Sequence, residues 1–194
     1  MTDDELIEAV RAAVLDRALP PPASPSDVAC AEAVIGRAFP PLLRRLYLEV
    51  ADGGFGIWPV LSVTDNGEWF SDEPDIMEAH RQWASNPVKP PGVVPLMDRG
   101  CAMWTLVDFT TEEGRIWDWD PYTCCALAPT TLSLKEWLAG WLDGGIEPGP
   151  HPHFRLHTED CPSEHGTVIR SVEKRGTHEE EASGRPAHRD QPRR

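Results

Sequence analysis

The sequence predicts an α+β fold in which N-terminal helices and a C-terminal helix pack on one face of an antiparallel sheet. Apolar residues recur at helical spacing through the first fifty residues, and β-rich segments joined by short turns occupy 93–128. A helical pattern then returns over 134–142. Connections of hairpin length join antiparallel strands, and helices segregated from such a sheet define the α+β class.

Three helices are predicted before the first glycine pair. A capping box at Thr2 starts a helix over about residues 3–17. Ser24, followed by proline, starts the second helix. The third has a single apolar stripe through Leu42–Val50. Gly53 and its glycine neighbour end it, because glycine adopts the left-handed C′ conformation without a Cβ clash.

The middle of the chain changes to a β pattern. Gly56–Thr64 is apolar and β-branched, which indicates a strand, and 73–84 indicates a short helix. Three further strands are expected at Val93–Met97, Cys101–Phe109 and Arg115–Trp119. A weaker fourth strand is expected at Cys124–Ala128. A second capping box at Ser133 then opens a closing helix that Gly144 ends.

Charge and aromatic residues divide the chain into two parts. It has 194 residues and a formal net charge of -14, and 24 of its 32 acidic side chains precede residue 151. All eight tryptophans also precede residue 151, whereas only eight of the last 47 residues are apolar or Cys. Such a segment buries too little apolar surface to offset its ordering entropy. We therefore predict an acidic domain over 1–147 and a mostly disordered Pro-, His- and charge-rich tail over 148–194.

The composition excludes several classes of partner and location. Strong acidity argues against binding nucleic acid or anionic membranes, which require clustered Lys and Arg, and favours a basic protein partner. No apolar run approaches the length of a membrane span, and the acidic N-terminus is unlike an export signal. Five cysteines, an odd number with no metal spacing, do not form a secreted disulfide framework. A reduced, cytoplasmic protein is expected.

Catalytic and cofactor motifs are lacking from the sequence. It contains no phosphate-binding, dinucleotide-binding, nucleophile-elbow or zinc-protease motif, so we predict a non-enzyme without cofactor or metal. The His-rich tail matches no metal-finger spacing. One alternative stays open, a metal-dependent enzyme that uses strand-end aspartates. These are Asp98, Asp108, Asp118 and Asp120.

A mixed surface of tryptophan and aspartate is the candidate binding site. Trp117 and Trp119 alternate with Asp118 along one strand, and Trp104 shares a face with Asp108 on the previous strand. Tryptophan is enriched at the energetic centres of interfaces. The candidate partner-binding residues are Trp58, Trp69, Asp98, Trp104, Asp108, Asp118, Trp119 and Asp120. Because Asp120 precedes a proline, it is also expected to cap a turn.

The stretch AEAVIGRAFPPLLRRLYLEVADGGFG resembles the N-terminal signature of the SUKH superfamily, of the Smi/Knr type. That signature combines an acidic residue, a glycine, an apolar residue with proline, an amphipathic helix and Asn-Gly-Gly. Here its residues are Glu32, Gly36, Pro40, Asp52, Gly53 and Gly54. Aspartate stands where the family has asparagine. The strands and last helix are similar to actinobacterial members, and the resemblance covers about residues 28–146.

The resemblance implies an α+β fold and a function in protein binding. Many bacterial members look like immunity proteins, which sequester a toxin, often a nuclease. An acidic inhibitor suits a nuclease because it presents the charge that the enzyme's basic cleft attracts. The eukaryotic relatives imply the alternative of a general scaffold or regulatory protein. No shared catalytic residues come with the family.

Overall fold

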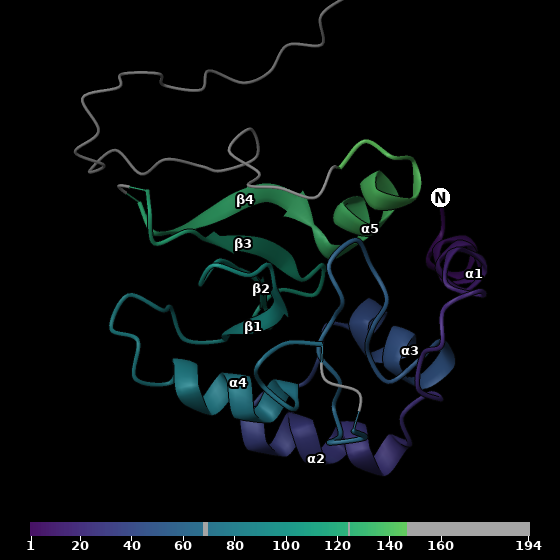
Figure 1. The fold of residues 1–194 in the computed structure, drawn as a ribbon, viewed down its shortest axis with the longest axis horizontal. Helices are drawn as coiled ribbons and strands as arrows, with labels where there is room; N and C mark the ends of the chain where they lie inside the picture. The colour runs from purple at the N-terminus through teal and green to yellow at the C-terminus, as the bar shows by residue number, and fades with distance from the viewer. Residues whose placement is uncertain (68–69, 124, 147–194) are drawn as a thin grey trace, which may run out of the picture.

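The structure is a computed structural model, and it describes residues 1–67, 70–123 and 125–146. Its elements follow the chain as three helices, a fourth helix, four strands and a closing helix (Figure 1). The helices are α1 (Asp3–Ala13), α2 (Pro25–Ile35), α3 (Pro41–Glu49), α4 (Ile76–Trp83) and α5 (Leu134–Leu142). The strands are β1 (Val93–Asp98), β2 (Trp104–Asp108), β3 (Arg115–Trp119) and β4 (Leu127–Ser133). The predicted α+β class is confirmed.

Local sequence signals set the helix ends. Thr2 and Ser133 form the predicted capping boxes of α1 and α5, and Ser24 forms a third with Asp27. Each box satisfies two backbone N–H groups that a helix start leaves without intrahelical partners. Gly36 ends α2 in the left-handed conformation, with φ of 77°.

The four strands form an antiparallel meander in the order β1-β2-β3-β4. Short turns between neighbours make this the simplest route through the sheet. A bulge in β1 lies between Pro95 and Met97. It sends two consecutive side chains, Leu96 and Met97, into the core, where both are fully buried.

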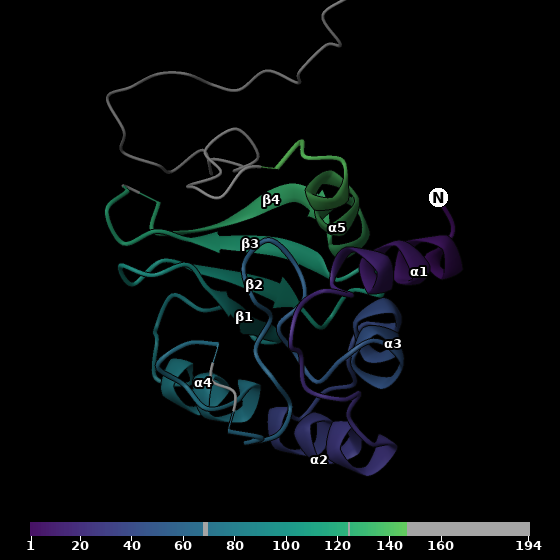
Figure 2. The same ribbon diagram turned by 45° about the vertical axis from the view of Figure 1, so that its right-hand side comes forward.

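One face of the sheet shares its core with the helices. Helices α1, α3 and α5 lie together beside the sheet, while α4 and α2 lie below its β1 edge (Figures 1 and 2). Sheet residues Val94, Val107 and Ile116 belong to the same buried cluster as Leu46 of α3 and Trp137 of α5. This shared cluster confirms that the helices pack on one face of the sheet, as predicted.

The other face of the sheet carries the tryptophans of β2 and β3. The strand register sets Trp104 opposite Trp119 and Leu106 opposite Trp117. Residues directly opposite in an antiparallel pair project to the same side. Leu106, although fully buried, lies outside the main core cluster. Of the tryptophans on this face, Trp104 also packs against the main core cluster.

Several predicted elements differ in the structure. The predicted strand Cys101–Phe109 begins only at Trp104, because residues 100–102 form a turn with positive φ. Residues 56–64 form no strand; they make one isolated bridge, Val60 with Met97, and residues 56–59 form a turn that begins at Gly56, whose φ is 98°. The fourth strand begins at Leu127 instead of residue 124, since the preceding residues form a turn held by Asp120. Helix α1 ends at Ala13, four residues before its predicted end. None of the helices in the described parts of the chain is long and apolar enough to cross a membrane.

Candidate functional site

The second sheet face and the end of α4 form the candidate site, which we call the tryptophan face. It comprises Trp83, Trp104, Trp117, Trp119, Asp98 and Asp108. Trp83 lies edge-to-face on both Trp104 and Trp119, with ring centroids 6.2 and 5.2 Å apart. All three rings are half-buried. Edge-to-face pairs add stability beyond their buried area, so the rings form a fixed cluster with part of their surface in solvent.

Two aspartates mark opposite ends of the tryptophan face. Asp98 lies opposite Trp104, and Asp108 lies opposite Val93 at the other end of the same strand pair. Each carboxylate accepts a backbone N–H two residues on: Gly100 at 2.7 Å for Asp98 and Thr110 at 2.8 Å for Asp108. These contacts hold both carboxylates in place without neutralising their charge.

A buried ion pair lies behind the tryptophan face. Arg99, just after β1, pairs with Asp118 of β3, and the two side chains are 1% and 4% exposed. Arg99 Nη2 also donates to the carbonyl oxygens of Trp104, at 3.3 Å, and Trp119, at 2.9 Å. One guanidinium therefore joins the backbones of the two strands that carry the paired tryptophans.

The structure separates the predicted binding residues into distinct places. Asp98, Trp104 and Trp119 come together, with Asp108 at the far end of the same face. Asp118 projects to the opposite face and is buried with Arg99. We therefore leave Asp118 out of the tryptophan face, because its charge is already used within the fold.

Asp120 and Trp58 do not join the face. Asp120 is 8% exposed and accepts the backbone N–H of Tyr122 at 2.9 Å, which confirms its expected role in a turn. Trp58 packs against the main core. Trp69 lies outside the described residues, as does the tail over 148–194.

The turn between β1 and β2 is unusual in its backbone. Gly100, Cys101 and Ala102 all have positive φ, at 77°, 52° and 61°. A positive φ raises the free energy of any residue that has a Cβ atom. Such strain persists only where the surrounding structure imposes it. Two backbone hydrogen bonds close this turn, from Arg99 N to Met103 O at 2.9 Å and from Met103 N to Gly100 O at 3.0 Å. The exposed tip is thus held in one shape beside the tryptophans.

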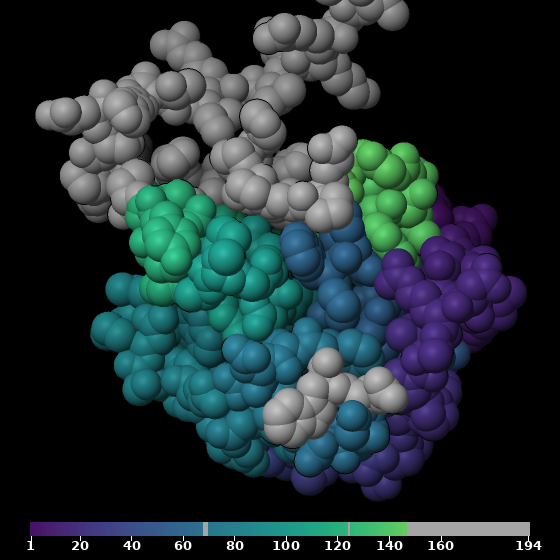
Figure 3. Space-filling model, in the orientation of Figure 1, coloured from purple at the N-terminus to yellow at the C-terminus, as the bar shows by residue number. Residues whose placement is uncertain are grey.

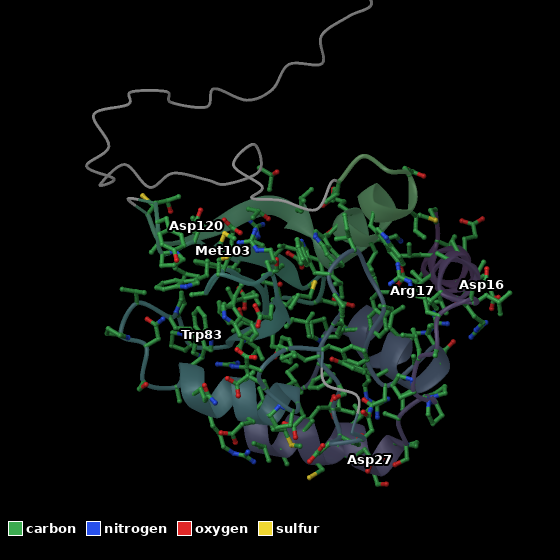
Figure 4. The ribbon with its side chains drawn as sticks, viewed as in Figure 1. Asp16, Arg17, Asp27, Trp83, Met103 and Asp120 are labelled. Carbon is green, nitrogen blue, oxygen red and sulfur yellow. The ribbon has the colours of Figure 1, made fainter. Side chains whose placement is uncertain are left out.

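The site lies on one side of the molecule. Figure 4 places Trp83, Met103 and Asp120 on that side, and Asp16 and Arg17 on the opposite side. In the space-filling view the teal and green surface of the strands is likewise separated from the purple surface of the N-terminal helices (Figure 3). A binding test can therefore compare this side with a distant one on the same chain.

Burial changes the titration of groups around α4. It lowers the pKa of the His80 imidazole from its usual 6.5, and the nearby positive charges of Lys89 and Arg81 lower it further. Burial also lowers the pKa of Lys89, whose Nζ donates to the Val93 carbonyl at 2.9 Å. Burial therefore favours the neutral form of both groups.

We expect His80 to make stability fall with acidification. Since its pKa is lowered in the fold, the unfolded chain takes up the proton first as pH falls through 6.5. The melting temperature should drop between about pH 7.5 and 5.5, and the slope should flatten in His80→Gln. Circular dichroism melts measure both. An equal slope in the variant would assign the effect to another group.

The signature residues have structural roles. Glu32 Oε1 accepts the backbone N–H of Phe39 at 3.0 Å and lies 3.5 Å from Arg44 Nε. This joins the end of α2 to the start of α3, while Gly36 makes the turn between them. Pro40 is the N-cap residue of α3.

The Asp-Gly-Gly part of the signature fixes the loop after α3. Asp52 is 3% exposed and accepts from Val63 N at 2.7 Å, from Thr64 Oγ1 and from Asn66 Nδ2 at 3.1 Å. All three groups are donors, so a carboxylate, with acceptors only, suits a position where the family has asparagine. Gly53 and Gly54 have φ of 90° and 79°, respectively.

The aspartates of the enzyme alternative do not converge. Asp98 and Asp108 lie at opposite ends of one face, and Asp118 lies on the other face. Within the described residues, no three His, Cys, Asp or Glu side chains come together to hold a metal ion. The arrangement offers an aromatic surface with acidic ends.

The sequence interpretation missed Trp83 and Arg99. Trp83 lies in the predicted short helix, and only its tertiary contacts identify it as part of the site. Arg99 lies in a turn, and neither periodicity nor spacing indicates that a turn arginine is buried. Its neighbour Asp118, a charge in an apolar strand, is the one signal that a buried partner is needed.

Comparison with known proteins gives one family. A family model described as the SMI1 / KNR4 family (SUKH-1) matches residues 22–140. No curated protein matches, and no solved structure matches. The matched region runs from the turn before α2 into α5 and includes the whole signature and all four strands. The chain therefore belongs to the SMI1 / KNR4 family (SUKH-1).

Proposed function

We propose that this protein acts by binding another protein, as an immunity protein that neutralises a bacterial toxin such as a nuclease. The observation that carries the proposal is the tryptophan face, a rigid cluster of half-buried indoles with a carboxylate at each end. Half-buried tryptophans offer large contact areas with few rotatable bonds. The acidic chain adds long-range attraction for a basic partner.

Family membership supports the same proposal. The resemblance to SUKH proteins implies function through partner proteins, and its bacterial members include immunity-like proteins. The two charged ends fit a nuclease, because a phosphate-binding cleft presents several cationic side chains to an inhibitor. The roles of the signature residues also fit, since they stabilise the fold and leave the sheet face for recognition.

Co-expression with a toxin tests the function. The toxin domain is taken from the reading frame adjacent to this gene and produced in cells with and without the protein. We expect restored growth and a complex that isolates intact at low salt. If growth is not restored and no complex forms at micromolar protein, that toxin is not the partner. Several weak partners and no dominant one would favour the scaffold alternative.

Removing Trp83 should weaken that complex strongly. Trp83→Ala removes the ring that contacts both Trp104 and Trp119, and loss of such an anchor costs about 2 kcal/mol, or roughly thirtyfold in Kd. Trp141→Ala, which alters a half-buried ring on α5, is the matched control. Calorimetric titration measures affinity, and thermal melts verify folding. Equal losses in both folded variants would place the interface elsewhere.

Neutralising the acidic ends should slow association. Asp98→Asn with Asp108→Asn keeps an amide oxygen for each turn hydrogen bond and removes two charges. Asp16→Asn with Asp143→Asn removes the same charge from exposed positions outside the tryptophan face. We expect the first pair alone to lower the association rate severalfold, and less so at high salt. An equal effect of both pairs would mean that net charge acts without a local site.

A further inference from the structure

The last ten residues of the chain carry a charge opposite to that of the domain. Residues 185–194 contain four arginines, one histidine and a single acid, Asp190. The preceding part of the tail, 147–184, contains four basic and eight acidic side chains. The positive charge of the tail is therefore concentrated at its end. A basic segment on an acidic protein is a candidate ligand for that protein's own surface.

The tryptophan face has the chemistry that arginine recognises. A guanidinium stacks on indole faces through cation–π attraction and also pairs with carboxylates. The face offers Trp83, Trp104 and Trp119 for stacking, and Asp98 and Asp108 for pairing.

The tail is long enough to return to this face. Ile146, the last described residue, donates its N–H to the Gly140 carbonyl at 3.1 Å and so starts the tail beside α5. The 38 residues of 147–184 span roughly 30–40 Å as a flexible chain, whereas four paired strands are only about 15 Å across. Tethering at this length gives an effective concentration on the order of a millimolar.

We propose that the arginine-rich C-terminal segment, residues 185–194, docks on the tryptophan face of its own chain. The docked segment covers the surface that the proposed function assigns to a basic partner. The docking stands by itself, and only the competition with a partner rests on the proposed function. A partner must then displace the segment, so weak basic partners are rejected while a tight one still binds. The apparent affinity of any partner falls by the fraction of chains whose face is covered.

The indole signals of the full-length chain test the docking directly. The tested variant changes Arg185, Arg189, Arg193 and Arg194 to Gln, and the control changes Arg155, Arg170, Lys174 and Arg175 to Gln. Both variants remove four tail charges. The indole N–H signals are assigned by single Trp→Phe changes in nitrogen-15 NMR spectra. We expect the tested variant, and high salt in the wild type, to shift Trp83, Trp104 and Trp119 but not Trp137.

A synthetic peptide of residues 185–194 completes the test. Added to the tested variant, it should return the three signals towards their wild-type positions. Unchanged signals in the tested variant, or equal shifts in both variants, would overturn the docking. Because this test needs no toxin, a failure of the docking can be distinguished from a failure of the proposed function in the co-expression test. If a toxin is found, the tested variant should bind it about three to ten times more tightly than the wild type.

Discussion

Replacing Asp118 with alanine should lower the free energy of unfolding by about 3–5 kcal/mol. The change leaves the Arg99 guanidinium buried beside the sheet without its carboxylate, at a position where that side chain is only 1% exposed. Arg99 cannot lose its charge to relieve the penalty. It is also held by two carbonyl oxygens, Trp104 O and Trp119 O, so it cannot leave without breaking those contacts.

Two further variants separate charge from shape. Asp118→Asn keeps the size of the side chain and should still destabilise, because the amide carries no negative charge. Removing both partners, in Arg99→Met with Asp118→Leu, should cost less than Asp118→Ala alone. Asp98→Ala, at a partly exposed turn carboxylate, should cost about 1 kcal/mol. Urea unfolding gives each value, and a loss below about 1 kcal/mol for Asp118→Ala would contradict a buried charge pair.

Replacing Gly53 with alanine should cost about 2–5 kcal/mol. A Cβ at this position would lie 2.8 Å from both Ser62 N and Val60 O, which are backbone atoms that cannot rotate away. The residue also has φ of 90°, which side chains disfavour. The clash falls on the loop that Asp52 holds through Val63 N and that bridges to β1 at Val60.

Gly36→Ala is the control for conformational strain alone. Gly36 has a similar φ of 77°, but no heavy atom lies within 4 Å of a Cβ built there. It should therefore cost only about 1–2 kcal/mol. Thermal and urea unfolding of the two variants measure the difference, which is the cost of the backbone clash. Equal losses would mean that the 60–62 backbone moves aside without penalty.

The helices were predictable because their signals are local. Thr2, Ser24 and Ser133 each begin a helix through contacts within three residues, and these contacts need no tertiary context. The apolar pattern of Cys124–Ala128 predicts a start of the fourth strand that is too early, because the turn that Asp120 makes with Tyr122 and Thr123 cannot be seen in that pattern. Pro129 lies within the observed strand and pairs with Trp117 at the end of the sheet order, a place where proline is tolerated.

The sequence pattern predicts on which sheet face the candidate residues lie, but not which of them are buried. Alternation correctly placed Trp117 and Trp119 on one side of β3 and Asp118 on the other. It did not reveal that Asp118 faces a buried arginine from a turn nineteen residues earlier. Trp83 was missed for the same reason, because its position depends on how α4 meets the sheet.

The contact between α1 and α5 has a consequence for folding during synthesis. Asp3 of α1 pairs with Lys135 of α5 at 2.7 Å, so this contact forms only after α5, the last described helix, has been synthesised. At about 5–20 residues per second the ribosome needs several seconds to cover that separation. The meander of neighbouring strands involves only short loop closures and can form earlier. Helix α1 can pack against α3 early, whereas its packing against α5 must follow the synthesis of α5, so we expect the core around Leu6 and Val10 to be completed late.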